Sequence, residues 1–205
     1  DDPGVEGSSA ETRYGAFRAL STLDPNDPFI RGEPLGEQKS INFHVLDTAG
    51  EPMAHLTTYK KSEIVLFGAD QQFRLPIAVR AGSKILITGS QGEDTITVAR
   101  YEPGREDQRQ IVSTKVRDVI RAVADLGASY PDLAQMLVQA DRQHNLPGRL
   151  ELDALPKAGR VYIRPTEGAE ESSPARTRIG NPSAAPDLFA GGQEEDREGQ
   201  DSGVA

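Results

Sequence analysis

The chain has 205 residues, with 32 Asp+Glu against 23 Lys+Arg, a net charge of −9 and no cysteine. This length fits one domain of ordinary size, and the lack of cysteine excludes a disulfide framework, a thiolate zinc site and a cysteine nucleophile. The acidic balance argues against non-specific binding to nucleic acid, and no apolar run of about eighteen residues offers a membrane span.

A polar lead-in and one helix are predicted first. Residues 1–10 are rich in Gly, Pro and Ser, which indicates an unstructured segment. Apolar residues then recur at spacings of three and four over 11–23, which predicts a helix with Ser9 as its N-cap. Because the chain begins at Asp1 rather than Met, we expect a fragment or a processed form, in which a missing signal peptide carries no information.

Residues 40–112 carry the alternation and turn signals of β-structure. Strands are expected at 41–46, 53–59, 63–67, 73–80, 84–88, 94–101 and 108–113. Pro76 indicates that its strand lies at a sheet edge. Glu63, at the start of one apolar run, and Asp70, after it, are interpreted as loop residues rather than as an acid–base pair.

Two helices and two short closing strands are predicted next. The first helix covers 114–126 with Ser113 or Thr114 as its cap, and the second follows Ser129. A short loop between two amphipathic helices predicts an antiparallel hairpin packed on the sheet. Apolar residues within 150–163 predict the closing strands.

These elements predict an α+β fold, with a mostly antiparallel sheet packed against the helical hairpin 114–144. A single domain over 11–164 is expected between disordered ends, since the acidic tail 165–205 is too polar to offset the entropy of ordering. The residues expected in the core are Phe17, Leu20, Phe43, Val45, Val65, Phe67, Ile85, Ile87, Ile96, Val98, Val119, Ile120, Val123, Leu133 and Leu137.

The acidity belongs to the two ends of the chain. Residues 1–10 hold three acids, and residues 165–205 hold nine acids and three arginines. Residues 11–164 therefore carry 20 acids and 20 bases and are neutral. A neutral domain has no net field for an ionic partner, so we expect it to recognise partners by shape and local contacts.

His44 and His55 are the candidate metal ligands. A hairpin centred on Ala49 and Gly50 would place them opposite each other on one face, with Cβ atoms about 5 Å apart. Two facing imidazoles suit zinc or copper, or a pH-sensitive contact. Spacing supplies no third ligand, so two surface histidines are the alternative, and no cofactor is assigned.

Motifs of the common enzyme sites are missing from the sequence. It has no G-x-S-x-G elbow, P-loop, dinucleotide fingerprint, H-E-x-x-H or EF-hand loop. This pattern favours a non-catalytic module over an enzyme. Six basic residues between Arg100 and Arg121 are interrupted by acids, which favours an ion-paired face over a nucleic-acid site.

Three strings of the sequence are distinctive: FHVLDTAGEPMAHLT (43–57), EIVLFGADQQF (63–73) and the segment 116–162. They resemble the C-terminal extension of flagellar P-ring-like (FlgI-like) proteins, over roughly residues 12–164. The resemblance implies a non-enzymatic structural role, because P-ring subunits assemble around the flagellar rod in the periplasm at the peptidoglycan layer. The glycine-rich region typical of the ring-forming part is absent here, and no functional residue of the family has a motif match.

Three roles remain after this reading. The first is a structural module of a periplasmic assembly, whose partners are proteins, further copies of itself or cell-wall material. The second is a protein-binding module unrelated to flagella. The third is a metal-dependent enzyme that uses His44 and His55. No nucleic-acid partner and no membrane span are expected.

Overall fold

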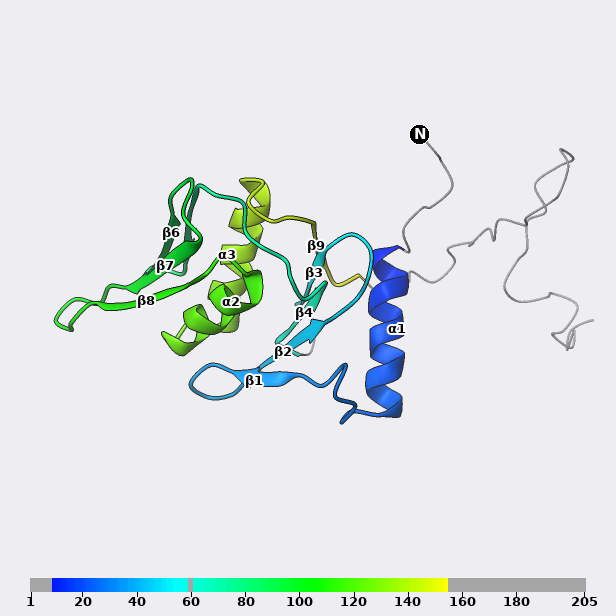
Figure 1. Cartoon of the computed structure of the whole chain (residues 1–205). Helices are drawn as coiled ribbons and strands as arrows, with labels where there is room; N and C mark the ends of the chain where they lie inside the picture. Colours follow the sequence, from blue (N-terminus) through cyan, green and yellow to red (C-terminus); the bar gives the residue numbers. More distant parts are fainter. Residues whose placement is uncertain (1–8, 59–60, 155–205) are drawn as a thin grey trace, which may run out of the picture. The chain divides into compact units, whose positions relative to one another are not determined.

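The structure, a computed structural model, describes residues 9–58 and 61–154 of the chain. These residues contain three helices and nine strands (Figure 1). The helices are α1 (Ala10–Leu23), α2 (Val116–Asp125) and α3 (Tyr130–Arg142). The strands are β1 (Glu33–Leu35), β2 (Ile41–Leu46), β3 (Met53–Thr57), β4 (Glu63–Phe67), β5 (Ile77–Ala81), β6 (Ile85–Gly89), β7 (Thr95–Arg100), β8 (Gln108–Ser113) and β9 (Arg149–Leu152).

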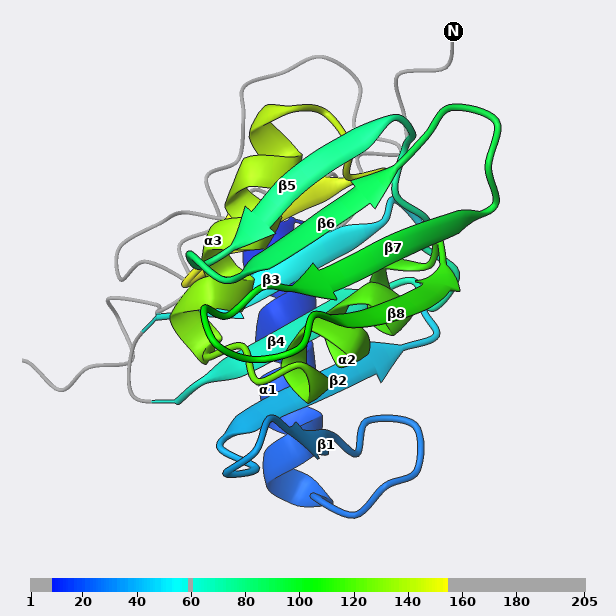
Figure 2. The same ribbon diagram turned by 90° about the vertical axis from the view of Figure 1, so that its left-hand side faces the viewer.

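These elements stack in four layers (Figure 1 and Figure 2). α1 covers one face of a five-stranded sheet with the order β1-β2-β4-β3-β9. α2 and α3 lie on its other face, between this sheet and a four-stranded meander, β5-β6-β7-β8. α2 packs against β1, β7 and β8, while α3 packs against β5 and β9. The helical hairpin therefore fills the space between two sheets.

The predicted α+β class is confirmed, and five of the seven strand pairings are antiparallel. The single sheet expected over 40–112 is wrong, because β5 to β8 form a second sheet. The composition of α2 explains this division. Six of its ten residues are buried, so its apolar surface is too broad for one sheet to cover.

Local side-chain signals place the helix ends. The Ser9 hydroxyl accepts from the Thr12 N–H at 3.3 Å, which is the predicted N-cap of α1. Ser129 forms a capping box with Asp132 at the start of α3. Ser113 accepts from the Lys115 N–H at 3.2 Å, but the N-cap of α2 is Lys115 itself, so the expected cap, Ser113 or Thr114, lies one or two residues too early.

Backbone bonds to distant segments explain where β5 begins. The N–H groups of Phe73 and Arg74 donate to the carbonyls of Thr114 and Asn145, at 2.8 and 2.7 Å. These residues therefore do not pair with β6, and the strand starts at Ile77 rather than at 73. The predicted strand at 161–163, the tail 165–205 and residues 1–8 of the lead-in lie outside the described residues.

Two apolar cores lie on opposite faces of the five-stranded sheet. The larger joins both sheets to α2 and α3, and the smaller lies under α1 around Tyr14, Phe17 and Phe67. Of the residues expected in the core, Val45 is half-buried and Leu20 is 51% exposed, so Leu20 is a wrong prediction. Leu20 is exposed because the part of α1 that is buried reaches only as far as Tyr14 and Phe17, whereas the apolar stripe of the helix continues beyond them.

Candidate functional site

The two candidate metal ligands lie on strands that are not neighbours. β4 lies between β2 and β3, and His44 and His55 are both aligned with Val65. The predicted hairpin is therefore wrong, and the two histidines stand two strand spacings apart, about 10 Å. The reason is β4, which is apolar after Glu63 and is buried along its whole length. A strand of this kind lies in the centre of a sheet, between β2 and β3, rather than at its edge.

His44 is held by groups of three different segments. Its Nδ1 lies 2.8 Å from the Ile30 carbonyl oxygen, and its ring meets that of Phe17 edge-on at 4.9 Å. Its Nε2 lies 3.8 Å from a Glu63 carboxylate oxygen. A Cβ at Gly32 would come within 2.6 Å of this ring, so only glycine lets the loop after α1 approach so closely.

His55 is completely buried beneath α1. Its ring stacks on Tyr14 at 3.6 Å, and its Nε2 accepts from the Ala154 N–H at 3.0 Å. The ring proton must then be on Nδ1, which has no hydrogen-bond partner among the described residues. Burial lowers the pKa of His55 to about 4, although Asp153 acts in the opposite direction.

Glu63 is the buried carboxylate of the site, only 4% exposed. The Tyr14 hydroxyl donates to it at 2.9 Å, while Arg18 lies 3.7 Å away. From the opposite face of the sheet, the Tyr130 hydroxyl donates to the carbonyls of Glu63 and Thr57, at 3.1 and 2.7 Å. Burial raises the pKa of Tyr130 to about 12. These bonds tie α1 and α3 to the same pair of strands.

This network could not be predicted from spacing. Glu63 was expected in a loop, but it opens β4 and pairs with Thr57 of β3, so that interpretation is wrong. The sequence signal that could have identified Glu63 is an acidic residue at the start of an otherwise apolar strand. A carboxylate that is buried with such a strand needs a hydrogen-bond donor nearby. Asp70 does lie in a turn and is exposed.

Replacing Tyr14 by Phe tests whether the hydroxyl stabilises the buried carboxylate. Among the described residues, the change leaves the Glu63 carboxylate with the longer Arg18 and His44 contacts, at 3.7 and 3.8 Å. We expect the free energy of unfolding to fall by about 2 kcal/mol, measured by urea denaturation. Tyr101→Phe removes a hydroxyl from a 41% exposed side chain and is the matched control, with an expected change under about 0.5 kcal/mol.

This cluster holds α1 against the five-stranded sheet. The Tyr14 hydroxyl is hydrogen-bonded to both Thr57 and Glu63, and these bonds join α1 to β3 and β4. Among residues 9–58 and 61–154, no group of three or more His, Asp or Glu side chains could hold a metal ion. The structure thus brings each candidate histidine into the α1 contact but does not bring the two together.

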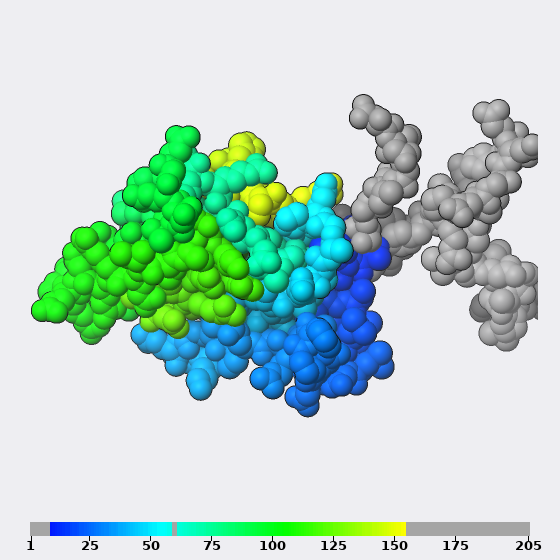
Figure 3. Space-filling view, in the orientation of Figure 1, coloured from blue at the N-terminus to red at the C-terminus, as the bar shows by residue number. Residues whose placement is uncertain are grey.

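An apolar groove of about 510 Å³ lies between α1, the loop that follows it and the β2–β3 connection. In Figure 3, the blue spheres of α1 and of the loop after it meet on one face. The apolar residues lining this α1 groove include Ala16, Phe17, Leu20, Phe29, Ile30 and Phe67. Phe29 is 83% exposed, and Leu23, at the end of the same helix, is 82% exposed.

Arg13 fixes one side of the α1 groove. Its guanidinium lies 4.9 Å from the centre of the Phe67 ring and donates to the Glu51 carbonyl at 2.7 Å. Burial lowers the pKa of Arg13, while Glu51 acts in the opposite direction. This contact holds α1 against the β2–β3 connection, so the groove has a fixed wall before any partner arrives.

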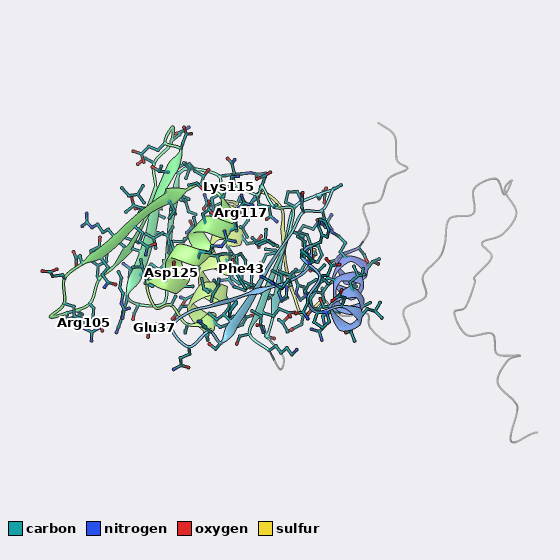
Figure 4. The ribbon with its side chains drawn as sticks, turned by 60° about the horizontal axis from the view of Figure 1, so that its bottom comes forward. Glu37, Phe43, Arg105, Lys115, Arg117 and Asp125 are labelled. Carbon is teal, nitrogen blue, oxygen red and sulfur yellow. The ribbon has the colours of Figure 1, made fainter. Side chains whose placement is uncertain are left out.

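The basic residues between Arg100 and Arg121 do not gather into one patch. Figure 4 shows Arg105 far from Lys115 and Arg117. Lys115 lies 2.9 Å from Asp70, and Arg121 lies 2.6 Å from Glu33. Arg100 and Arg105 both pair with Glu102. Arg117 lies 3.8 Å from Asp118, so five of the six basic residues take part in ion pairs, as the interspersed acids predict.

No protein-family model, curated protein or solved structure matches this chain. The helices within residues 9–58 and 61–154 include none long and apolar enough to cross a membrane. What the chain does must therefore be inferred from the contacts and surfaces described above.

Proposed function

We propose that this chain is a non-catalytic structural module of a periplasmic assembly, of the kind that the resemblance to FlgI-like P-ring proteins implies. One observation carries the proposal. Of the six exposed large apolar side chains in the described residues, Leu20 and Phe29 line the α1 groove, and Leu23 lies one turn beyond Leu20 at the end of α1. Exposed large apolar side chains in and beside a groove are typical of a protein contact.

The positions of the two histidines also support a structural role. His44 and His55 are engaged in the contact between α1 and the sheet, at opposite sides of β4. Their separation gives no support to the alternative of a metal-dependent enzyme. A fixed α1 and a layered core are properties that a structural module needs, because a partner then meets a preformed surface and less ordering entropy is lost on binding.

Binding to a purified FlgI-like ring-forming region and to isolated peptidoglycan tests this proposal. We expect the chain to bind at least one of them, measured by biolayer interferometry and co-sedimentation. The double variant Leu23→Ser/Phe29→Ser is expected to bind at least tenfold more weakly, because it removes two apolar contacts of roughly 1–2 kcal/mol each. Its fold, measured by circular dichroism, should be unchanged.

Tyr101→Ser is the matched control, since it removes another exposed large side chain away from the α1 groove. It should bind like the wild type. Undiminished binding by the double variant would show that the groove is not the contact surface. If neither the ring-forming region nor peptidoglycan is bound, the periplasmic role is wrong, and a protein partner outside the flagellum becomes the better hypothesis for the groove.

A further inference from the structure

The edges of the two sheets differ in how they are protected. β1 has three residues and β9 has four, which is too short for extensive pairing. α3 covers the edge of β5, where Gln139 accepts from the Arg80 N–H at 3.0 Å. β8 has six residues, including one charged residue, and contains no proline. Among the described edges, β8 alone lacks the usual protection against pairing with another strand.

β8 is the last strand of its sheet, and its free edge has a definite end. Figure 2 shows it at the margin of the meander, next to β7. Beyond β8, the Thr114 carbonyl accepts from the Phe73 N–H, and the Val116 N–H donates to the Gln71 carbonyl, at 2.8 and 2.9 Å. The edge open to a partner therefore covers residues 108–113. Ile111, in its middle, is 72% exposed.

We infer that β8 pairs antiparallel with β8 of a second copy of this chain, across a two-fold axis at Ile111. The pairing joins two four-stranded meanders into one continuous sheet. Each Ile111 then lies against its counterpart, and both exposed side chains are buried. This self-association goes beyond the role proposed for the α1 groove and depends on none of its residues.

The register follows from the side chains of β8. Residues paired across a two-fold axis lie on the same face, so the residue on the axis faces itself. An axis at Arg109 would place two guanidinium groups together, and an axis at Gln110 would place Arg109 against Ile111. An axis at Ile111 places Arg109 opposite Ser113, and the paired region then ends at Ser113, where the free edge ends.

Charges outside β8 favour the antiparallel orientation. The exposed Glu106 and Asp107 precede the strand, whereas Lys115 and Arg117 follow it and share the exposed Asp70. Antiparallel pairing brings the acidic pair of each copy toward the basic pair of the other. Parallel pairing would place acidic pairs together. Figure 4 shows Arg105, which directly precedes the acidic pair in the sequence, far from Lys115 and Arg117. The acidic and basic pairs therefore flank β8 at opposite ends.

The same geometry predicts a weak dimer. A single six-residue edge buries less than the roughly 800 Å² per partner of a standard stable interface. We therefore expect a dimer that forms only at high protein concentration. Within a larger assembly, the linkage of many copies would raise the effective concentration of this contact.

Single-cysteine variants test the register, because the chain has no cysteine of its own. Arg109→Cys, Gln110→Cys, Ile111→Cys and the control Ser90→Cys, in the β6–β7 turn, are oxidised mildly at low and high protein concentration. We expect disulfide-linked dimer, read on a non-reducing gel, to be at least fivefold more abundant for Ile111→Cys than for the others. Directly opposed residues come close enough for a disulfide.

Sedimentation equilibrium supplies an independent measurement on the whole chain. The wild type should show a concentration-dependent dimer, and Ile111→Lys should weaken it at least tenfold with an unchanged circular dichroism spectrum. The Leu23→Ser/Phe29→Ser variant should dimerise like the wild type, which separates this inference from the proposed function. A monomeric wild type, equal linking at all four positions, or strongest linking at Gln110→Cys overturns the inference.

Discussion

Lowering the pH from about 7 to about 4 is expected to destabilise the fold by roughly 3 kcal/mol through His55 alone. Burial lowers the pKa of this side chain from 6.5 to about 4, whereas the unfolded chain keeps the ordinary value. Between pH 6.5 and about pH 4, His55 binds a proton in the unfolded state but stays neutral in the folded state. The stabilising contribution is therefore complete above pH 6.5 and is lost as the pH falls to about 4.

The surroundings of His55 explain why the folded state refuses the proton. The imidazole has no exposed surface, and it lies against the Tyr14 ring at 3.6 Å. The lone pair of Nε2 already accepts a hydrogen bond from the Ala154 N–H. Protonation of Nε2 would therefore place two N–H donors against each other. The Asp153 carboxylate favours the charged form, but desolvation is the larger effect.

The difference between the wild type and His55→Gln isolates this effect from the carboxylates that also titrate in the range. We expect the variant to be less stable at pH 7, because it loses the stacking on Tyr14, but its stability should decline less from pH 6.5 to pH 4. Urea denaturation at several pH values measures both. His144→Gln provides the matched control for a His-to-Gln replacement, since this histidine side chain is exposed. Parallel curves for the wild type and His55→Gln would contradict the assignment.

Most elements of the fold could be predicted because their signals are local. Ser9 and Ser129 mark helix starts by capping, and Gly127, with φ of +85°, marks the end of α2. The alternation of Ile77, Val79 and Ala81 survives as the buried side of β5. Such patterns report the two faces of one element, and they need no knowledge of its neighbours.

The order of the strands could not be predicted, because it depends on contacts between distant segments. The turn at Ala49 and Gly50 suggests a hairpin, but β4 separates the two strands that flank it. The same limit explains the site. The position of His55 beneath Tyr14 requires α1 to fold back over β3. The local sequence pattern near Tyr14 or near His55 does not predict this contact between the two segments.

Leu20 shows how far helical periodicity can be taken. It continues the stripe of Phe17 at the expected spacing, yet it is 51% exposed. Periodicity identifies the face of a helix that can be buried, but the extent of the opposing sheet decides how much of that face is covered. Leu20, which the sheet leaves uncovered, lines the α1 groove, so the failed core prediction marks the proposed contact surface.

Leu137→Ala is expected to lower the free energy of unfolding by about 3 kcal/mol, because it leaves a cavity at a fully buried position of α3. This residue belongs to the core that joins both sheets through the helical hairpin. We therefore expect one cooperative transition in urea, with hydrogen-exchange protection lowered in β2 to β4 and in β5 to β8 together. Leu20→Ala, on the exposed end of the α1 stripe, should cost less than about 0.5 kcal/mol.

A loss of protection confined to the four-stranded meander would contradict this expectation. It would mean that the two sheets unfold separately and that α2 and α3 belong to only one of them. The contacts argue against that outcome, since α3 packs on β5 of one sheet and on β9 of the other, and α2 packs on β8 and β1. Because both helices contact both sheets, a cavity at Leu137 weakens packing that neither sheet can replace alone.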